Sequence, residues 1–552
     1  MNYDYLIKNG KVVDGSGNPA FESSLAISDG KIAALLHNHE DISAAQENSR
    51  EVIDAAGLIV CPGFIDMHSH ADWVLPLPDH PTTLAPLLEQ GITTVVGGNC
   101  GYSTAPLAPR SPYLDLVASE SEFLADKPLN LEWSTMASFF EHLEQQGLAL
   151  NLAMLAGHGN LRLSMFGQPD VCPGEQGFAE MVWAAGEALK EGACGISLGL
   201  GYSPGIFSDI SELERFAVCA REHNRLLTVH LKAYTKLSGA YPLKLIGNQS
   251  HNIRALEEMI NLARRTGVKM QISHLLFVGR STWPLADRCL ELIENAVADG
   301  IDLAFDSFPY SCGNTTIYIA YPTWFRNNIE KNFKSNAARM RVKLEIGLIS
   351  NQLGFGLEDI QILWGGTPEL DQFNGLFFDE IAKQMGTSTI EAYLQVSEKS
   401  KGKTLCLMHK YNGEEGNMSV LDRVVCHPLN LVETDTILTT RGLQNPSSFG
   451  TFPRVIQRYC KEISALSLEE AIAKMTAKSA ERFGLNNRGK ISEGNWADIT
   501  IFDYDEIADN TTLRELENRP SGIKHVLLNG TEVVRGGVMI KGVKAGQALR
   551  VS

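Results

Sequence analysis

Long apolar runs recur along the middle of the chain, with helix-patterned segments between most of them. Strands that are buried on both faces form continuous apolar runs of this kind. We predict eight such strands, at residues 58–66, 93–98, 150–156, 195–200, 226–230, 269–274, 301–306 and 429–435. The helical segments between them include 178–191, 210–223, 252–265 and 284–298. This alternation predicts an α/β fold, a TIM-like (β/α)8 barrel of parallel strands.

The two ends of the chain have a different pattern, in which short β-rich runs are separated by turns. Examples are residues 5–7 near the start and 499–502 near the end. Short runs of this type are typical of small antiparallel strands. We therefore predict a small β-sandwich domain formed by residues 1–57 and 488–552, with the barrel at 58–487.

The gap between the seventh and eighth predicted strands is too long for a single crossover helix. It extends from Asp306 to the eighth strand at 429–435, whereas most connections in a barrel need only one helix and two short loops. Long insertions near the mouth of a barrel commonly form lids or binding subdomains. We expect an inserted lid or subdomain at roughly 311–420.

Composition and charge narrow the class of protein. Of 552 residues 44% are hydrophobic and 20% charged, and the mean hydropathy is −0.08, which fits a globular protein and excludes a disordered chain. We find no apolar run as long as a membrane helix and no secretion signal at the start, so we predict a cytoplasmic protein. A net charge of −17 disfavours nucleic-acid and anionic-membrane partners and favours a small molecule. The oligomeric state stays open.

Residues able to bind a metal ion follow the predicted barrel strands. Two histidines end the first strand two positions apart, so that both imidazoles face one side. The complete set is His68, His70, Cys100, His230, His274 and Asp435. Because the carboxyl ends of barrel strands meet at one mouth, we expect these side chains to converge there. Neutral imidazole and thiolate are ligands that suit Zn²⁺, so the sequence predicts a zinc site.

Each of these residues also has a structural interpretation when it is taken alone. A single histidine in an apolar strand is more often a core residue than a ligand, and most of the ten cysteines fit small buried hydrophobic residues. The shared position at strand ends favours the metal site over this alternative. Among the cysteines, Cys100 is set apart by its flanking glycines, which let the backbone approach closely.

Several motifs resemble those of a known family. The opening run 62–72 (PGFIDMHSHAD) and the closing run 488–499 (RGKISEGNWADI) resemble signatures of the amidohydrolase superfamily. Five further motifs resemble the N-acyl-D-amino-acid deacylases, or D-aminoacylases: 98–101 (GNCG), 157–162 (GHGNLR), 272–274 (ISH), 308–310 (FPY) and 450–454 (GTFPR). The resemblance covers nearly the whole chain but does not settle the substrate.

The resemblance implies a role for each candidate ligand. In the deacylases a cysteine after the second strand replaces the carboxylated lysine that bridges two metal ions in many other amidohydrolases. Cys100 matches that cysteine, and the fourth predicted strand has no lysine. The family pattern implies that Cys100, His230 and His274 hold a tightly bound zinc. It also implies a second, weaker ion at His68 and His70, with Cys100 bridging.

The acid at the end of the eighth strand has an implied catalytic role. By resemblance Asp435 is the general acid/base, which accepts a proton from zinc-bound water and then protonates the departing amine. The family's usual Gly-Ser-Asp ending is Glu433-Thr434-Asp435 in this chain. Glu433 is therefore an additional carboxylate, which either raises the pKa of a neighbouring carboxyl group or pairs with a cation.

The resemblance also implies which residues meet the substrate. In D-aminoacylases a lysine, a tyrosine and an arginine grip the substrate carboxylate; this chain keeps Tyr310 but has Leu276 and Ser447 at the two cationic positions. We add Tyr202 and His158 to the expected substrate contacts. Without the two charges the clamp for a carboxylate is lost, so we expect a substrate that lacks a free carboxylate. Lys232, Arg280 and Arg441 are the alternative sources of a cation.

Three functions remain in competition. The first is a zinc-dependent amidohydrolase that cleaves an amide C–N bond, similar to the N-acyl-D-amino-acid deacylases. The second is a cyclic-amide hydrolase of the hydantoinase or dihydroorotase type, which the missing strand-four lysine disfavours. The third is a non-catalytic scaffold that retains the barrel to bind a partner. The presence of every ligand type together with Asp435 disfavours the scaffold.

Overall fold

Eight parallel strands form the barrel at the centre of the computed structural model, which describes residues 2–168, 170–241 and 249–552. In order they are β6 (Phe64–Asp66), β7 (Ile92–Gly97), β8 (Asn151–Gly157), β9 (Gly195–Gly199), β10 (Leu226–His230), β11 (Lys269–Ile272), β12 (Leu303–Ser307) and β16 (Asn430–Val432). Each predicted barrel strand corresponds to one of them. The predicted fold class is confirmed.

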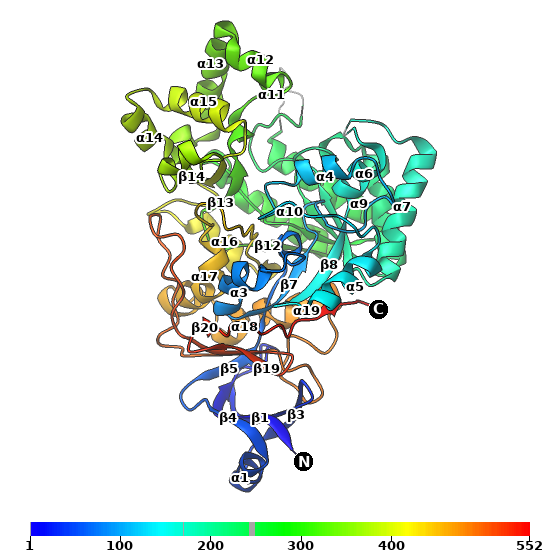
Figure 1. Cartoon of the computed structure of the whole chain (residues 1–552), viewed down its shortest axis with the longest axis vertical. Coiled ribbons are helices and arrows are strands. Elements are labelled where there is room, and N and C mark those ends of the chain that lie inside the picture. The colour runs from blue at the N-terminus through cyan, green and yellow to red at the C-terminus, as the bar shows by residue number, and fades with distance from the viewer. Residues whose placement is uncertain (1, 169, 242–248) are drawn as a thin grey trace.

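Helices surround the barrel (Figure 1). They are α2 (His80–Thr83), α3 (Ala85–Glu89), α4 (Leu114–Glu120), α5 (Met136–Gln146), α6 (His158–Phe166), α7 (Gly174–Lys190), α8 (Ile210–Glu222), α9 (His251–Thr266), α10 (Ala286–Ala298), α16 (Ser419–Cys426), α17 (Ser447–Arg454), α18 (Leu468–Met475) and α19 (Ala477–Phe483). In α8, the Asp209 side chain caps the start by accepting from the Glu212 N–H. Leu213, Phe216 and Ala217 are buried at helical spacing, so α8 packs one apolar face against its neighbours.

The barrel closes between its first and last strands just beyond their carboxyl ends. Ser69 and Thr436 form a parallel bridge. The His70 N–H donates to the Thr436 carbonyl at 3.0 Å, and the Asp435 N–H donates to the His68 carbonyl at 3.0 Å. The closure therefore places the segment that carries the two histidines directly beside Asp435.

A second sheet joins the two ends of the chain, below the barrel in Figure 1. It contains β1 (Tyr3–Val12), β2 (Phe21–Ser28), β3 (Lys31–Leu36), β4 (Ser49–Asp54), β5 (Ile59–Pro62), β17 (Ile499–Phe502), β18 (Ile523–Leu528), β19 (Thr531–Arg535) and β20 (Val538–Met539), with α1 (His39–Glu47) beside it. β5 links the two halves, because it pairs with β1 on one side and β17 on the other. The last strand, β21 (Ala548–Leu549), leaves this sheet and pairs with β8 of the barrel.

The segment predicted as one strand at 58–66 is two strands in different sheets. The break is at Gly63, whose N–H donates to the Asp498 carbonyl at 2.8 Å. A Cβ at this position would lie 2.3 Å from the Thr93 side chain, so only glycine allows the close approach. Both halves are fully buried, so the apolar run continues through the break and conceals it.

The insertion between β12 and β16 forms a subdomain at the top of Figure 1. Its antiparallel sheet has the order β13 (Cys312–Thr316), β15 (Leu405–His409) and β14 (Ile360–Trp364). Its helices are α11 (Thr323–Arg326), α12 (Ile329–Lys334), α13 (Asn336–Leu353), α14 (Phe378–Met385) and α15 (Thr389–Ser400). The proposed domain boundaries stay a prediction. Across the described residues, no helix combines the length and apolar character needed to span a membrane.

Candidate metal centre

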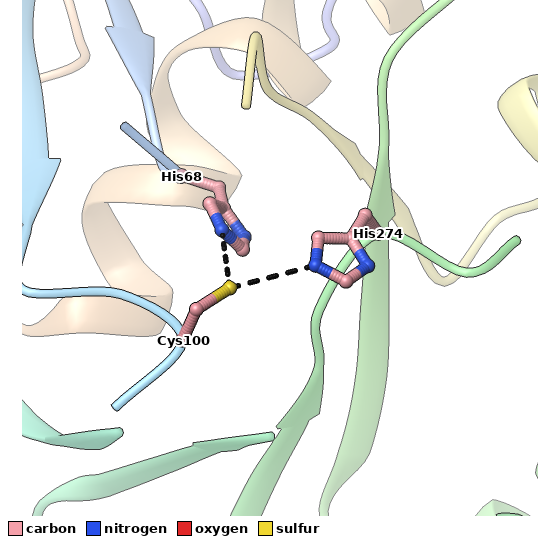
Figure 2. A group of neighbouring side chains, drawn as sticks. All are labelled: His68, Cys100 and His274. Atoms are coloured by element: carbon pink, nitrogen blue, oxygen red, sulfur yellow. Dashed lines mark hydrogen bonds between the residues drawn. The ribbon is translucent and has the colours of Figure 1, made fainter. Parts of the chain in front are cut away.

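A thiol and two imidazoles meet at the mouth of the barrel (Figure 2). The Sγ atom of Cys100 lies 3.2 Å from Nε2 of His68 and 3.5 Å from Nε2 of His274. The three residues follow β6, β7 and β11, and all three are buried. Their convergence comes from the barrel, which brings these strand ends to one place.

The other three predicted metal-site residues join the same cluster. Nδ1 of His230 lies 3.7 Å from the Cys100 Sγ and 2.9 Å from Nε2 of His274. On the opposite side, Oδ1 of Asp435 lies 3.5 Å from Nε2 of His68 and 3.7 Å from Nε2 of His70. The structure thus brings all six residues together at one mouth.

Three of these residues have left-handed backbone conformations. The φ angles are 58° at Cys100, 31° at His274 and 47° at Asp435. Side chains with a Cβ rarely adopt such angles, and the surrounding structure must offset the strain. Strain of this kind clusters at functional sites, where it turns a side chain toward its ligand.

The loop that carries Cys100 rests on the fourth barrel strand. The Ser197 hydroxyl donates to the Gly98 carbonyl and accepts from the Gly101 N–H at 3.0 Å. Gly98 has a φ of 74°, and a Cβ there would lie 2.2 Å from the Leu155 carbonyl oxygen. β9 therefore supports the cysteine loop, and this strand carries no lysine.

The protonation of the cluster suits a metal ion. Burial lowers the pKa of His68 and of His274 to about 3, and it lowers the pKa of His70 and His230 well below the ordinary value. Neutral imidazoles keep a lone pair for a ligand. Burial, and then the charge of Asp435, raises the pKa of the Cys100 thiol, so its thiolate needs a cation beside it. A set of sulfur and nitrogen donors fits zinc.

Two buried residues near the ligands do not belong to the predicted site. Asp306, at the end of β12, accepts from the His274 N–H at 2.6 Å and lies 3.5 Å from Nδ1 of His68. Carboxylates in such positions orient metal-binding histidines. The Tyr234 ring packs against His230 and His274 at 5.0 and 5.2 Å. The strand-end rule could have found Asp306, whereas Tyr234 carries no sequence signal.

The subdomain reaches the centre through Asn412. Its side-chain amide donates to the Leu275 carbonyl at 3.0 Å and accepts from the Phe277 N–H at 2.5 Å. These two backbone groups flank Leu276, two residues after His274. The subdomain therefore holds the loop that follows the sixth strand, and Leu276 is buried within it.

The predicted substrate residues have different surroundings. The Tyr202 hydroxyl donates to the Cys100 carbonyl at 2.8 Å, and its ring lies 4.7 Å from that of His230, so it borders the cluster. The Tyr310 hydroxyl donates instead to Asp509 at 2.9 Å, and the same carboxylate pairs with Arg454 at 3.1 Å. The hydroxyl of Tyr310 is thus already engaged by the chain's own carboxylate.

His158 and Ser447 lie apart from these contacts. Nε2 of His158 is 2.7 Å from Glu212, and its ring packs edge-on against Phe216 of α8. The structure therefore places this imidazole between α6 and α8. Ser447 begins α17 and is fully buried, and its hydroxyl has no hydrogen-bond partner in the described ranges.

The three alternative cations have other contacts. Arg280 forms a bidentate pair with Glu414. Arg441 donates to two backbone carbonyls and stacks on a tryptophan ring. Lys232 lies 5.5 Å from the Tyr241 ring centre and lines a cavity of about 370 Å³ with Glu258. Of the three, Arg280 alone forms an ion pair with a residue that the structure describes, and Lys232 and Arg441 form none.

A parallel barrel with histidines, a cysteine and an aspartate at its strand ends defines a metal-dependent amidohydrolase. A model of the amidohydrolase family matches residues 51–131 and 438–534. The N-acyl-D-glutamate deacylase of Alcaligenes xylosoxydans is 32% identical over 96% of this chain and 93% of its own. The chain therefore belongs to the amidohydrolase family and, within it, to the N-acyl-D-amino-acid deacylases.

Solved structures agree with this assignment. The N-acyl-D-glutamate deacylase of Bordetella bronchiseptica, complexed with zinc and a phosphonate inhibitor that mimics the tetrahedral intermediate, has a TM-score of 0.78 and 29% identity, with both chains covered completely. A D-aminoacylase described with a binuclear metal centre has a TM-score of 0.78 and 26% identity over 99% of this chain and 100% of that one. The predicted family is confirmed.

Proposed function

We propose that this chain is a zinc-dependent amidohydrolase that cleaves the amide C–N bond of a small N-acylated amine, as the N-acyl-D-amino-acid deacylases do. The observation that carries the proposal is the cluster of Cys100 and four histidines beside Asp435, in which all but the partly exposed His230 are buried. We infer that Cys100, His230 and His274 hold one zinc tightly. We further infer that His68 and His70 contribute a second, weaker position, and that the protein acts in the cytoplasm.

Asp435 is the residue that moves the proton. Burial raises its pKa, as do the charges of Asp306 and Asp66, so this carboxylate binds a transferred proton more readily than an exposed aspartate does. When bound, zinc supplies an activated water and polarises the scissile carbonyl. Asp435 accepts the proton from that water and passes it to the leaving nitrogen. Asp306 keeps the ligand loop in place through the His274 N–H.

The substrate is an amide without a free carboxylate. Leu276 and Ser447 supply no charge where D-aminoacylases have two cations, and Tyr310 already donates to Asp509. A carboxylate that binds beside these residues loses its hydration without gaining a charged partner. A neutral group, such as a primary amide or an ester, avoids this loss.

A matched pair of substrates tests the proposal. We expect kcat/KM for an N-acyl-D-amino-acid amide to exceed that for the free acid on zinc-loaded enzyme, with the L-enantiomers as chirality controls. The double variant Leu276→Lys, Ser447→Arg should shift the preference toward the acid by up to a few kcal/mol. A strong preference of the unmodified protein for the acid would contradict the neutral pocket. Lys232→Met and Arg441→Met would then test the two cations that have no ion pair among the described residues.

A further inference from the structure

Glu433 is a buried acid without a partner. It follows β16 at the end of the last barrel strand, and its side chain is fully buried. Neither carboxylate oxygen has a hydrogen-bond partner among the described residues. An unpaired carboxylate in the protein interior is strongly unfavourable, so a proton or a cation must balance it.

Two other ligand atoms lie next to this carboxylate. A carboxylate oxygen of Asp306, one of Glu433 and a ring nitrogen of His68 all lie within 4.8 Å of one another. Two ligands on opposite sides of one divalent ion are separated by twice the metal–ligand distance, roughly 4–5 Å. The spacing therefore matches a single ion.

The position differs from the cysteine-histidine centre. Nε2 of His68 faces Cys100 at 3.2 Å and Asp435 at 3.5 Å. Nδ1 of the same ring is the atom near Asp306, at 3.5 Å, and it has no hydrogen-bond partner within the described part of the chain. The two nitrogens of one imidazole thus face two different groups of ligands.

The described residues supply no directly paired cation to this second group, and Arg482 acts on Asp306 only from beyond ion-pair distance. The Asp306 oxygens accept from the His274 N–H and from the Gln271 amide, which are both uncharged donors. Within the described ranges, no lysine or arginine forms an ion pair with Asp306 or Glu433. Two buried acids side by side without a directly paired lysine or arginine form a set of oxygen donors suited to a hard ion.

We propose that the carboxylates of Asp306 and Glu433 form an additional cation site, rich in oxygen ligands, for a divalent ion of the Mg²⁺ or Mn²⁺ type, with the Nδ1–H of His68 directed at Asp306 beside it. It lies on the face of His68 that is turned away from the thiol. The family's usual Gly-Ser-Asp ending has a glycine where this chain has Glu433, and a glycine has no side chain to offer as a ligand. The site is thus a property of this sequence, independent of the substrate.

Manganese is the probe that tests the site. Zinc-loaded protein is equilibrated with Mn²⁺, both metals are counted by elemental analysis, and crystals are examined for anomalous scattering from manganese. We expect a manganese peak between the carboxylates of Asp306 and Glu433. Glu433→Gln, which keeps the size but removes the charge, should retain zinc and lose at least tenfold in manganese affinity.

A matched control is Glu89→Gln, because Glu89 is a buried glutamate that already has the Met539 N–H and Arg519 as partners. Its manganese content should equal that of the unmodified protein. A manganese peak found only between His70 and Asp435, or no uptake at all, would overturn the proposal and leave a proton on Glu433. Because the crystal measurement uses the unmodified chain, it decides the matter even if Glu433→Gln does not fold. Metal content is measured without substrate, so failure here is distinct from failure of the proposed reaction.

Discussion

The two ends of the barrel treat buried polar groups in opposite ways. At the amino-terminal end, Asp498 pairs with Arg488, accepts from Asn151 at 3.1 Å and accepts from the Asn529 N–H at 2.8 Å. At the carboxyl end, Glu433 has no hydrogen-bond partner in the described parts of the chain. Asp498 thus has its hydrogen bonds made, whereas Glu433 leaves its lone pairs free.

This difference separates stability from chemistry. A buried polar group whose hydrogen bonds are all made helps to specify the fold. A group held in a strained backbone with free lone pairs costs stability and offers ligands instead, as Cys100 and His274 do. Substitutions at the amino-terminal end of the barrel should therefore change the free energy of unfolding. Substitutions at the mouth should change metal content and turnover.

The test with the largest expected effect compares alanine substitutions of two buried cysteines. Cys100→Ala removes a metal donor at the mouth, so we expect loss of zinc and of measurable turnover. Cys194→Ala is the control, because Cys194 is also buried, precedes β9 and donates only to the Met154 carbonyl. It should keep both zinc and activity. Elemental analysis and steady-state assays decide; a Cys100→Ala protein with normal zinc would break the comparison.

At the amino-terminal end of the barrel, Asp498→Asn should lower the free energy of unfolding. It leaves the Arg488 guanidinium buried without its charged partner, which costs about 3–5 kcal/mol in the free energy of unfolding. Denaturant titration measures the loss. Glu187→Gln is the control, because its exposed pair with Lys190 should contribute about 1 kcal/mol or less. Equal effects of the two substitutions would contradict a structural role for the buried pair.

Asp435→Asn should separate proton transfer from metal binding. We expect it to keep the tight zinc and to lower kcat about 10²-fold or more, since the amide cannot exchange a proton in the same way. Single-turnover assays with zinc-loaded protein measure the chemical step. Near-normal turnover would assign the proton transfer to another acid, with Glu433 as the first to examine.

The smallest expected effect is on the stability of the protein at acidic pH, through a histidine near the amino-terminal end of the barrel. His80 is buried, with Nδ1 2.7 Å from the Leu77 carbonyl and Nε2 accepting from the Ala149 N–H at 3.1 Å. Burial lowers its pKa to about 4, so the unfolded chain binds the proton more readily between about pH 6.5 and pH 4. The free energy of unfolding should therefore decrease as the pH is lowered through that window, by about 2 kcal/mol at about pH 5.

The test of His80 is the unfolding free energy as a function of pH for the protein and for His80→Asn. The variant should be less stable near neutral pH, and its curve should be flatter between about pH 6.5 and pH 4. Parallel curves would show that this imidazole does not titrate on unfolding. Zinc content at neutral pH should be the same in both proteins, because His80 forms its hydrogen bonds with the backbone of Leu77 and Ala149 and not with the metal cluster.

The sequence predicts the barrel well, because strands buried on both faces leave apolar runs that end in His68, His230 or Asp435. It does not reveal the break at Gly63, where both strands are equally apolar. Nor does it predict that Asp509 engages Tyr310, because that contact depends on how the chain ends pack against the mouth. Local pattern predicts elements, whereas long-range contacts decide which side chains remain free.

The contact between the first and last barrel strands, called the seam here, constrains when the barrel can close during synthesis. The bridge from Ser69 to Thr436 joins segments that leave the ribosome far apart in time. Contacts of such long range form slowly, because the loop between them must first be ordered. The centre therefore assembles only after the subdomain has been synthesised, and an ion held by residues on both sides of the seam would stabilise the closed form by mass action.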